Sequence, residues 1–115
     1  MSEHTLKLQE EYYNYILNGT KRIEIRLNDE KRRLLSKGDT IRFLKEPLLK
    51  DSFYAKINDL IYFQNFNQMF ETFPIEILAD KSVNKESLLN SLNKFYPIEK
   101  QEKYGVCCIK LELLN

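Results

Sequence analysis

The clearest pattern in the chain is a strict alternation of apolar and charged residues over residues 22–27. Every second residue is apolar, namely Ile23, Ile25 and Leu27. Glu24 and Arg26 alternate with them, so in a strand they project together from the opposite face. This segment therefore predicts a strand with one face in the core and one charged face, entered through a turn at Gly19.

Similar alternation predicts further strands over residues 4–8, 41–43, 53–63 and 106–114. In the longest of these, the run Leu60-Ile61-Tyr62-Phe63 is apolar at every position, which predicts burial on both faces. The closing strand has an apolar face made by Cys107, Ile109, Leu111 and Leu113.

Helical spacing replaces alternation in three other segments. Residues 9–18 carry one apolar face, and Asn18-Gly19 supplies a left-handed end to the helix. Two later stripes are expected to pack into the core. They are Phe66, Met69, Phe70 and Phe73 in the first, and Leu88, Leu92 and Phe95 in the second, which Asn84 can cap. In the segment 9–18, the apolar face consists of Tyr12, Tyr13, Ile16 and Leu17. Shorter helical turns are expected over 29–35 and 98–103, and residues 75–84 give no clear assignment.

The order of these elements is strand, helix, strand, short antiparallel strands, helices and a last strand. It lacks the regular alternation of strand and helix that a parallel sheet needs. The pattern predicts the α+β class, with a small mixed β-barrel and helices packed at its ends. Residues 1–115 form one expected domain, because no repeat or linker interrupts them and the length suits one core.

Composition adds that this is a folded chain, with 43% hydrophobic and 30% charged residues. No uncharged apolar run approaches the roughly 18 residues that span a bilayer, and the first residues lack a basic segment before an apolar one. We therefore expect a cytoplasmic protein with no membrane association.

The two cysteines, Cys107 and Cys108, are neighbours in the sequence. Adjacent Cα atoms lie about 3.8 Å apart, closer than a relaxed disulfide allows, and on a strand the two side chains face opposite sides. They are expected to be small core residues. The chain has one histidine, His4, and nothing in the sequence calls for a metal or an organic cofactor.

Charge is distributed unevenly. The formal net charge is +1, yet residues 21–50 hold ten Lys or Arg residues and five acids, a local net charge of +5. Such a local positive field favours an anionic ligand of limited size, such as a few nucleotides, over a long duplex. A solvated loop of mixed charge remains the alternative, including for the basic cluster Lys31-Arg32-Arg33.

The charged face of strand 22–27 has a chemistry suited to nucleotides. A glutamate such as Glu24 can accept a hydrogen bond from the exocyclic amine of a base. Arg26 can donate two hydrogen bonds to a phosphate or to the edge of a guanine, and Lys21 adds a second cation. The alternative is an exposed ion pair between neighbours, worth at most about 1 kcal/mol.

Two motifs follow one another along the chain. They are Gly19-x-Lys21-x-x-Glu24-x-Arg26, followed by Leu27-Asn28-Asp29-Glu30-Lys31-Arg32, and Gly38-Asp39-x-Ile41-x-Phe43. Together they resemble the signature of the ASCH domain family. The ending Glu99-x-Gln101-Glu102-Lys103-Tyr104-Gly105-Val106, with the helix before it, is similar to the bacterial stand-alone branch of that family.

The resemblance implies a PUA-like fold, a small β-barrel related to RNA-binding modules, with a cleft that receives RNA or a modified nucleoside. Carried over to this sequence, the cleft residues are Lys21, Glu24 and Arg26, with Arg32 as a further nucleotide-binding candidate. A second group from the C-terminal side completes the candidate site: Gln101, Lys103 and Tyr104.

Three hypotheses follow, and nucleotide binding ranks first. In it Glu24 accepts from a base, Arg26 and Lys21 hold phosphate, and Tyr104 or Tyr12 offers a stacking face. In the structural hypothesis, ranked third, the charged face pairs internally or meets another protein. The oligomeric state is left open.

The second hypothesis is hydrolysis. Some small members of the family are amidohydrolases acting on N4-acetylcytidine through a lysine, a threonine three residues later and a distant glutamate. Lys21 matches the lysine, but the threonine position holds Glu24. Glu24 would then act as general base with Lys21 stabilising the oxyanion, and Glu71 or Glu76 as the distant acid. A ribonuclease would need the same pair, Lys21 and Glu24.

Overall fold

The computed structural model describes residues 1–114 and is built on one five-stranded sheet in the order β1-β3-β4-β5-β2. The strands are β1 (Glu3–Leu8), β2 (Ile23–Leu27), β3 (Thr40–Lys45), β4 (Ser52–Phe63) and β5 (Val106–Leu114). β1 runs parallel to β3, and the other neighbouring strands are antiparallel. The sheet order leaves β1 and β2 at its two edges.

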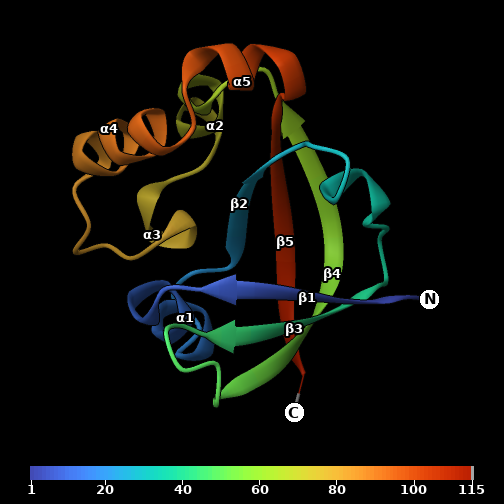
Figure 1. The fold of residues 1–115 in the computed structure, drawn as a ribbon. Coiled ribbons are helices and arrows are strands. Elements are labelled where there is room, and N and C mark those ends of the chain that lie inside the picture. Colours follow the sequence, from blue (N-terminus) through green and yellow to red (C-terminus); the bar gives the residue numbers. More distant parts are fainter. Residues whose placement is uncertain (115) are drawn as a thin grey trace.

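The sheet curls strongly, so that β1 and β3 cross over β2 and β5 (Figure 1). The long strand β4 makes the curl possible, because its first part pairs with β3 while its register with β5 extends to Phe63. A bulge between Ile57 and Asp59 separates the two parts, and such irregularities bend a strand. The result is a half-barrel whose edge strands approach each other across its opening.

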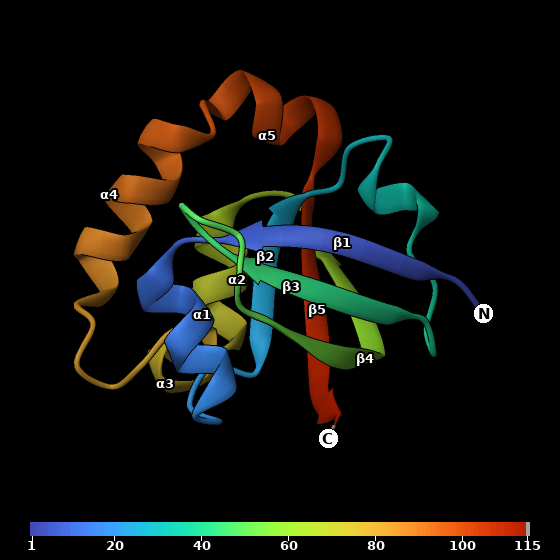
Figure 2. The same cartoon turned by 60° about the horizontal axis from the view of Figure 1, so that its bottom comes forward.

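Helices close the ends and the outer face of this half-barrel (Figure 2). They are α1 (Glu10–Leu17), α2 (Phe66–Thr72), α3 (Ile75–Leu78), α4 (Lys85–Phe95) and α5 (Ile98–Tyr104). A 3-10 turn, Arg32–Leu34, lies in the β2–β3 connection. The Asn84 side chain accepts a hydrogen bond from the Ser87 amide at the start of α4, and Gly19 ends the α1 segment at φ +89°, as predicted.

The core has two parts, on opposite faces of the sheet. One fills the inside of the curl and includes Phe43 and Cys107, and the other lies beneath α2, α3 and α4 and includes Phe66 and Cys108. Strand β5 contributes to both, because its neighbouring side chains point to opposite faces. The expected core roles of both cysteines are confirmed, since both are fully buried.

The predicted α+β class and curved mixed sheet are confirmed, but four apolar positions are more exposed than their pattern indicated. Tyr62 and Phe95 are 54% and 72% exposed, and Leu17 and Leu113 also lie at the surface. The predicted burial of residues 60–63 on both faces is wrong, because Leu60, Ile61 and Phe63 pack only partly against the two cores and Tyr62 is exposed. The segment 75–84, which had no assignment, contains α3.

None of the helices within residues 1–114 is long and apolar enough to cross a membrane.

Candidate functional site

The charged face of β2 is buried, contrary to the expectation of a simple exposed face. Lys21 and Glu24 are 3% and 5% exposed. The apolar face, with Ile23 and Ile25, packs under the helices as predicted. The opposite face is covered because β2 is an edge strand and the half-barrel brings the other edge strand, β1, across it.

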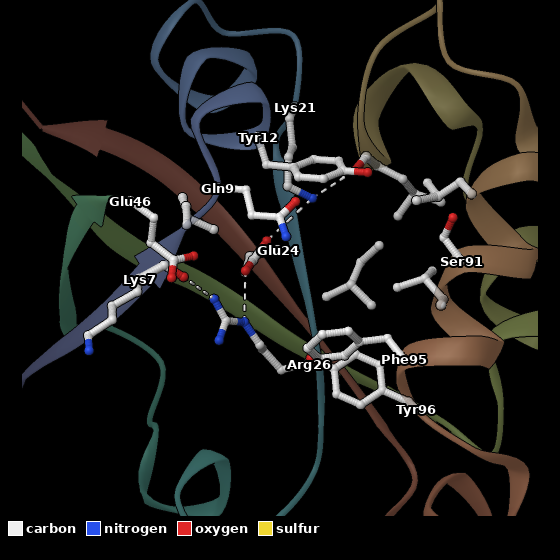
Figure 3. A pocket seen from close by; sticks show the side chains of 15 residues that line it. Lys7, Gln9, Tyr12, Lys21, Glu24, Arg26, Glu46, Ser91, Phe95 and Tyr96 are labelled. Atoms are coloured by element: carbon white, nitrogen blue, oxygen red, sulfur yellow. Dashed lines mark hydrogen bonds and ion pairs between the residues drawn. The ribbon is translucent and has the colours of Figure 1, made fainter. Parts of the chain in front are cut away.

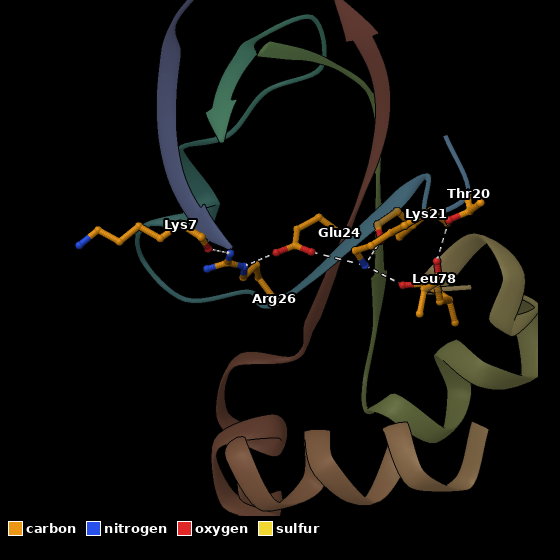
Figure 4. Close-up of polar contacts among 8 residues, drawn as sticks. Lys7, Thr20, Lys21, Glu24, Arg26 and Leu78 are labelled. Carbon is orange, nitrogen blue, oxygen red and sulfur yellow. Dashed lines mark hydrogen bonds and ion pairs between the residues drawn. The ribbon is translucent and has the colours of Figure 1, made fainter. Parts of the chain in front are cut away.

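Lys21 has all three of its ammonium donors occupied. Its Nζ atom donates to the carbonyl oxygens of Ile23 at 2.5 Å and Leu78 at 2.6 Å. It also lies 3.4 Å from Oε1 of Glu24 (Figure 4). Burial lowers the pKa of Lys21, and the Glu24 carboxylate only partly offsets that effect. Lys21 therefore ties the start of β2 to α3 and holds Glu24 in place.

Glu24 lies between two cations. Its Oε2 atom accepts from Nε of Arg26 at 2.8 Å, while Oε1 faces Lys21. Burial opposes ionisation, but the charges of Arg26 and Lys21 outweigh burial and lower the pKa of Glu24. The carboxylate is thus ionised at neutral pH and retains unused acceptor capacity, because its two oxygens offer about four lone-pair sites.

Arg26 bridges the two edge strands of the half-barrel. Its Nη2 atom donates to the Lys7 carbonyl of β1 at 2.8 Å, while Nε donates to Glu24. The side chain is 18% exposed. Since a guanidinium carries five N–H donors, three make no hydrogen bond within residues 1–114.

A pocket of about 290 Å³ opens above these groups (Figure 3). Glu24 and Arg26 lie at its floor. One wall comes from the end of β1 and from α1, with Leu8, Gln9 and Tyr12, and the opposite wall comes from α4. The α4 wall consists of Leu88, Ser91, Leu92 and Phe95, followed by Tyr96. The pocket thus combines apolar and aromatic walls with a few polar groups, the composition that ligand sites share.

Aromatic rings flank the pocket on both sides. The Tyr12 ring centroid lies 5.8 Å from Nζ of Lys21. On the other side, the rings of Phe95 and Tyr96 meet edge to face, with centroids 4.9 Å apart at 76°. Burial raises the pKa of both Tyr12 and Tyr96, so both hydroxyls are neutral at physiological pH.

Arg32, the further nucleotide-binding candidate, lies in the β2–β3 connection and does not line the pocket. Burial and the charge of Arg26 lower the pKa of Arg32, and Tyr96 is another neighbour that influences it. In the part of the chain that the structure describes, the buried Nε atom of Arg32 has no hydrogen-bond partner. The buried Oδ1 atom of Asn28 also lacks one.

The C-terminal group predicted for the site lies elsewhere. Gln101 is 1% exposed, and its side chain accepts from the Phe66 amide and donates to Asn93 and the Tyr96 carbonyl. Lys103 and Tyr104 line a separate depression beside the end of β4. The structure therefore does not bring these three residues to the floor occupied by Glu24 and Arg26.

The acids proposed for hydrolysis are also distant from the pocket lining. Glu71 and Glu76 are exposed on α2 and α3, and neither lines the pocket. The second carboxylate of the lining is that of Glu46, after β3. The Nε2 atom of His4 forms a hydrogen bond with Oδ2 of Asp39 at 2.8 Å, and neither residue lines the pocket.

Sequence reasoning missed the α4 wall. Phe95 was assigned to the core because it continues a helical stripe, and Tyr96, Ser91 and Gln9 carried no periodic signal. A clue did exist, since an aromatic pair directly before Pro97 places two large rings at a helix end. Within residues 1–114, no group of three or more His, Cys, Asp or Glu side chains is arranged to hold a metal ion.

Comparison with known proteins decides the family. The sequence model of the ASCH domain matches residues 6–115. The chain belongs to the ASCH domain family. Its curled sheet with helices is the PUA-like fold expected from the two motifs, and the site described above therefore lies in an ASCH domain.

Two solved structures are similar to this ASCH domain over its whole length. The hypothetical protein PH0355 is 35% identical, with a TM-score of 0.82 over 99% of this chain and 100% of its own. The protein PF0455 from Pyrococcus furiosus is 32% identical, with a TM-score of 0.77 over 100% and 99% of the two chains.

A more distant likeness shows the fold alone. A mutant ASCH protein from Zymomonas mobilis is 14% identical, with a TM-score of 0.67 over 96% of this chain and 72% of its own. No curated protein sequence matches the chain.

Proposed function

We propose that this ASCH domain binds RNA or a modified nucleoside by placing one nucleobase in the pocket between α1 and α4. The single observation that carries the proposal is the pairing at the floor, where an ionised acceptor and a charged donor lie 2.8 Å apart, at Glu24 and Arg26. We further propose that residues 1–115 act as one binding domain, as the sequence predicts.

The floor complements the edge of a base. Glu24 keeps acceptor capacity for an exocyclic amine, and Arg26 keeps three N–H donors for a ring nitrogen, a carbonyl oxygen or a phosphate. The surrounding Tyr12 and leucine side chains exclude water, which strengthens both contacts. A volume of about 290 Å³ lies near the lower end of the roughly 300–1,000 Å³ of ligand pockets and suits one base.

Lys21 takes a different part from the one the sequence suggested. Because its Nζ atom already contacts two carbonyl oxygens and Glu24, it acts as a positioning residue rather than a phosphate ligand. We assign phosphate contact instead to Arg26 and to Arg32, which lies outside the pocket lining and whose buried Nε atom has no hydrogen-bond partner within residues 1–114.

Amide hydrolysis is a second candidate, favoured by one observation. A lysine with a lowered pKa lies beside a carboxylate in a pocket, a combination common at catalytic sites. Against it, the lowered pKa of Glu24 makes that carboxylate a weak base towards water. Binding therefore ranks first.

The test is an amide NMR titration of the protein with cytidine, N4-acetylcytidine, the four nucleoside monophosphates and a short mixed-sequence RNA. We expect saturable shifts along β2 and α4, weakened about tenfold or more in Arg26→Lys, because lysine cannot reproduce the fork to Glu24 and Lys7. Arg42→Lys, on the exposed face of β3, is the matched control.

Acetate is followed in the same samples. Release of acetate from N4-acetylcytidine would move hydrolysis to first place. A titration without shifts at β2 for any of these compounds would contradict the binding proposal and leave the charged cluster with a structural role alone.

A further inference from the structure

We infer that the ligand continues beyond the base in the pocket, and that Phe95 carries a second base at the pocket mouth. The preferred ligand is then a single-stranded segment of at least two nucleotides rather than a free nucleoside. This inference rests on the proposed function, because it takes the first base to be in the pocket.

The position and exposure of Phe95 are the main observation. It is 72% exposed, although removing such an apolar side chain from water is favourable. The same ring borders the pocket, at the C-terminal end of α4. A large apolar ring left open at the mouth of a polar-floored pocket offers a flat surface on which any base can stack.

The ring is supported on one side. Tyr96 meets it edge to face at a centroid distance of 4.9 Å, and Tyr96 itself packs against Phe66 at 5.8 Å. The peptide group of Tyr96 is fixed as well, because its carbonyl accepts from Gln101 and its amide donates to the Leu92 carbonyl. A preorganised platform loses little entropy when a base stacks on it.

Two arginines lie on the Tyr96 side of the pocket, together with two carboxylates. Arg26 lines the pocket with Phe95 and Tyr96, and the charges of Arg26 and Arg32 act on the Tyr96 hydroxyl, as do those of Glu24 and Asp29. Among residues 1–114, no carboxylate lies within 4.0 Å of the Arg32 guanidinium, and its buried Nε atom has no partner. A phosphodiester between the two bases would supply the missing acceptor.

The experiment compares homodinucleotides of the four bases with the same dinucleotides lacking one base, by titration calorimetry at fixed salt. Removing the pocket base should abolish most binding. Removing the second base should weaken binding about 5- to 150-fold, the range expected for stacking of one base on an aromatic ring.

Variants locate that loss. The quantity compared is the ratio of two affinities, that for the dinucleotide over that for the form lacking the second base. In Phe95→Ala the two should bind almost equally, so this ratio falls towards one. Phe95→Tyr should restore the ratio, because it restores the ring. Tyr62→Ala, which truncates an aromatic residue 54% exposed on β4 outside the pocket lining, should leave the ratio unchanged.

Failures of the two proposals are distinguishable. If the wild-type protein binds every dinucleotide and its singly abasic form equally, the second-base inference is overturned while the pocket proposal stands. If the ratio persists in Phe95→Ala, Phe95 is not the platform. If no dinucleotide binds at all, the proposed function is overturned and this inference with it. Loss of self-association in Phe95→Ala with an unchanged ratio would assign the ring to a protein interface instead.

Discussion

Strand β2 and helix α5 each carry polar residues two positions apart, and the two elements place these residues very differently. Glu24 and Arg26 lie two residues apart on a strand and reach one pocket floor. Gln101 and Lys103 are also two residues apart, but on a helix, and they point in different directions: Gln101 is 1% exposed while Lys103 is at the surface. The same sequence spacing therefore has opposite consequences in the two elements.

The periodicity of each element explains the difference. Side chains at i and i+2 share one face of a strand, whereas on a helix of 3.6 residues per turn they are about 200° apart. Alternate residues of a strand motif can therefore be expected at the same site. On a short helix, residues two apart lie on different faces, and in α5 the inward-facing Gln101 makes structural hydrogen bonds.

The two regions also differ in how their polar groups are satisfied. Lys21, Glu24 and Arg26 satisfy one another and three backbone carbonyls across three elements. Gln101 satisfies one amide, one carbonyl and one side chain around the α4–α5 junction. Both are structural networks, but only the first keeps unused hydrogen-bonding capacity facing a pocket.

The largest expected effect is on stability and comes from Glu24→Ala. The truncation leaves the buried cation Lys21 and the partly buried cation Arg26 without their shared counter-ion, so the free energy of unfolding should fall by about 3–5 kcal/mol. Urea denaturation measures this. A loss below about 1 kcal/mol would mean that the cluster behaves like an exposed ion pair.

The pH dependence of Glu24→Gln tests the charge itself. The folded-state pKa of Glu24 is lowered, so its ionisation stabilises the fold above the ordinary carboxyl pKa of 4.5, and that contribution is lost as the pH falls through the folded value. The wild-type advantage over Glu24→Gln should therefore shrink below about pH 4.5. Glu102→Gln, an exposed change on α5, should follow the wild type at every pH.

The next effect is expected at Gln101→Ala. It leaves the Phe66 amide and the Tyr96 carbonyl without their partners in a buried position, which costs about 1–3 kcal/mol in the free energy of unfolding. Gln101→Glu is the matched variant. It keeps the side-chain shape and the acceptor for the Phe66 amide but loses the amide donor to Asn93 and the Tyr96 carbonyl. Equal stability of wild type and Gln101→Ala would show that α5 is held by its apolar contacts alone.

The fold followed from the sequence wherever the apolar period was long and continuous. Residues 22–27 and 53–57 alternate over enough positions to indicate both the strand and its core face. The curved sheet was predicted as well, but not how it curls: β4 pairs with β3 over residues 52–56 and with β5 over residues 54–63, with a bulge between Ile57 and Asp59. That curl is why Glu24 is buried rather than exposed.

The site was predictable only on β2. Its period places Glu24 and Arg26 on one face, and the family motif adds Lys21, but neither shows that Lys21 is bound by the Leu78 carbonyl from α3. The α4 wall was hidden for a related reason. A helical stripe tells which residues share a face, not where the covering element ends, so Phe95 was assigned to the core although it is 72% exposed.

The smallest expected effect belongs to Lys103→Ala. Lys103 is exposed, and its ammonium contacts the ring of Tyr104 at 5.1 Å from the centroid, a contact worth little at the surface. The free energy of unfolding should change by less than about 0.5 kcal/mol, and the affinity for a dinucleotide should stay the same within a factor of two. Calorimetry on this variant beside Arg26→Lys gives the sharpest contrast between the two regions. A comparable loss of affinity in both variants would mean that the bound chain runs from the α1–α4 pocket to the depression beside β4, and would return α5 to the binding surface.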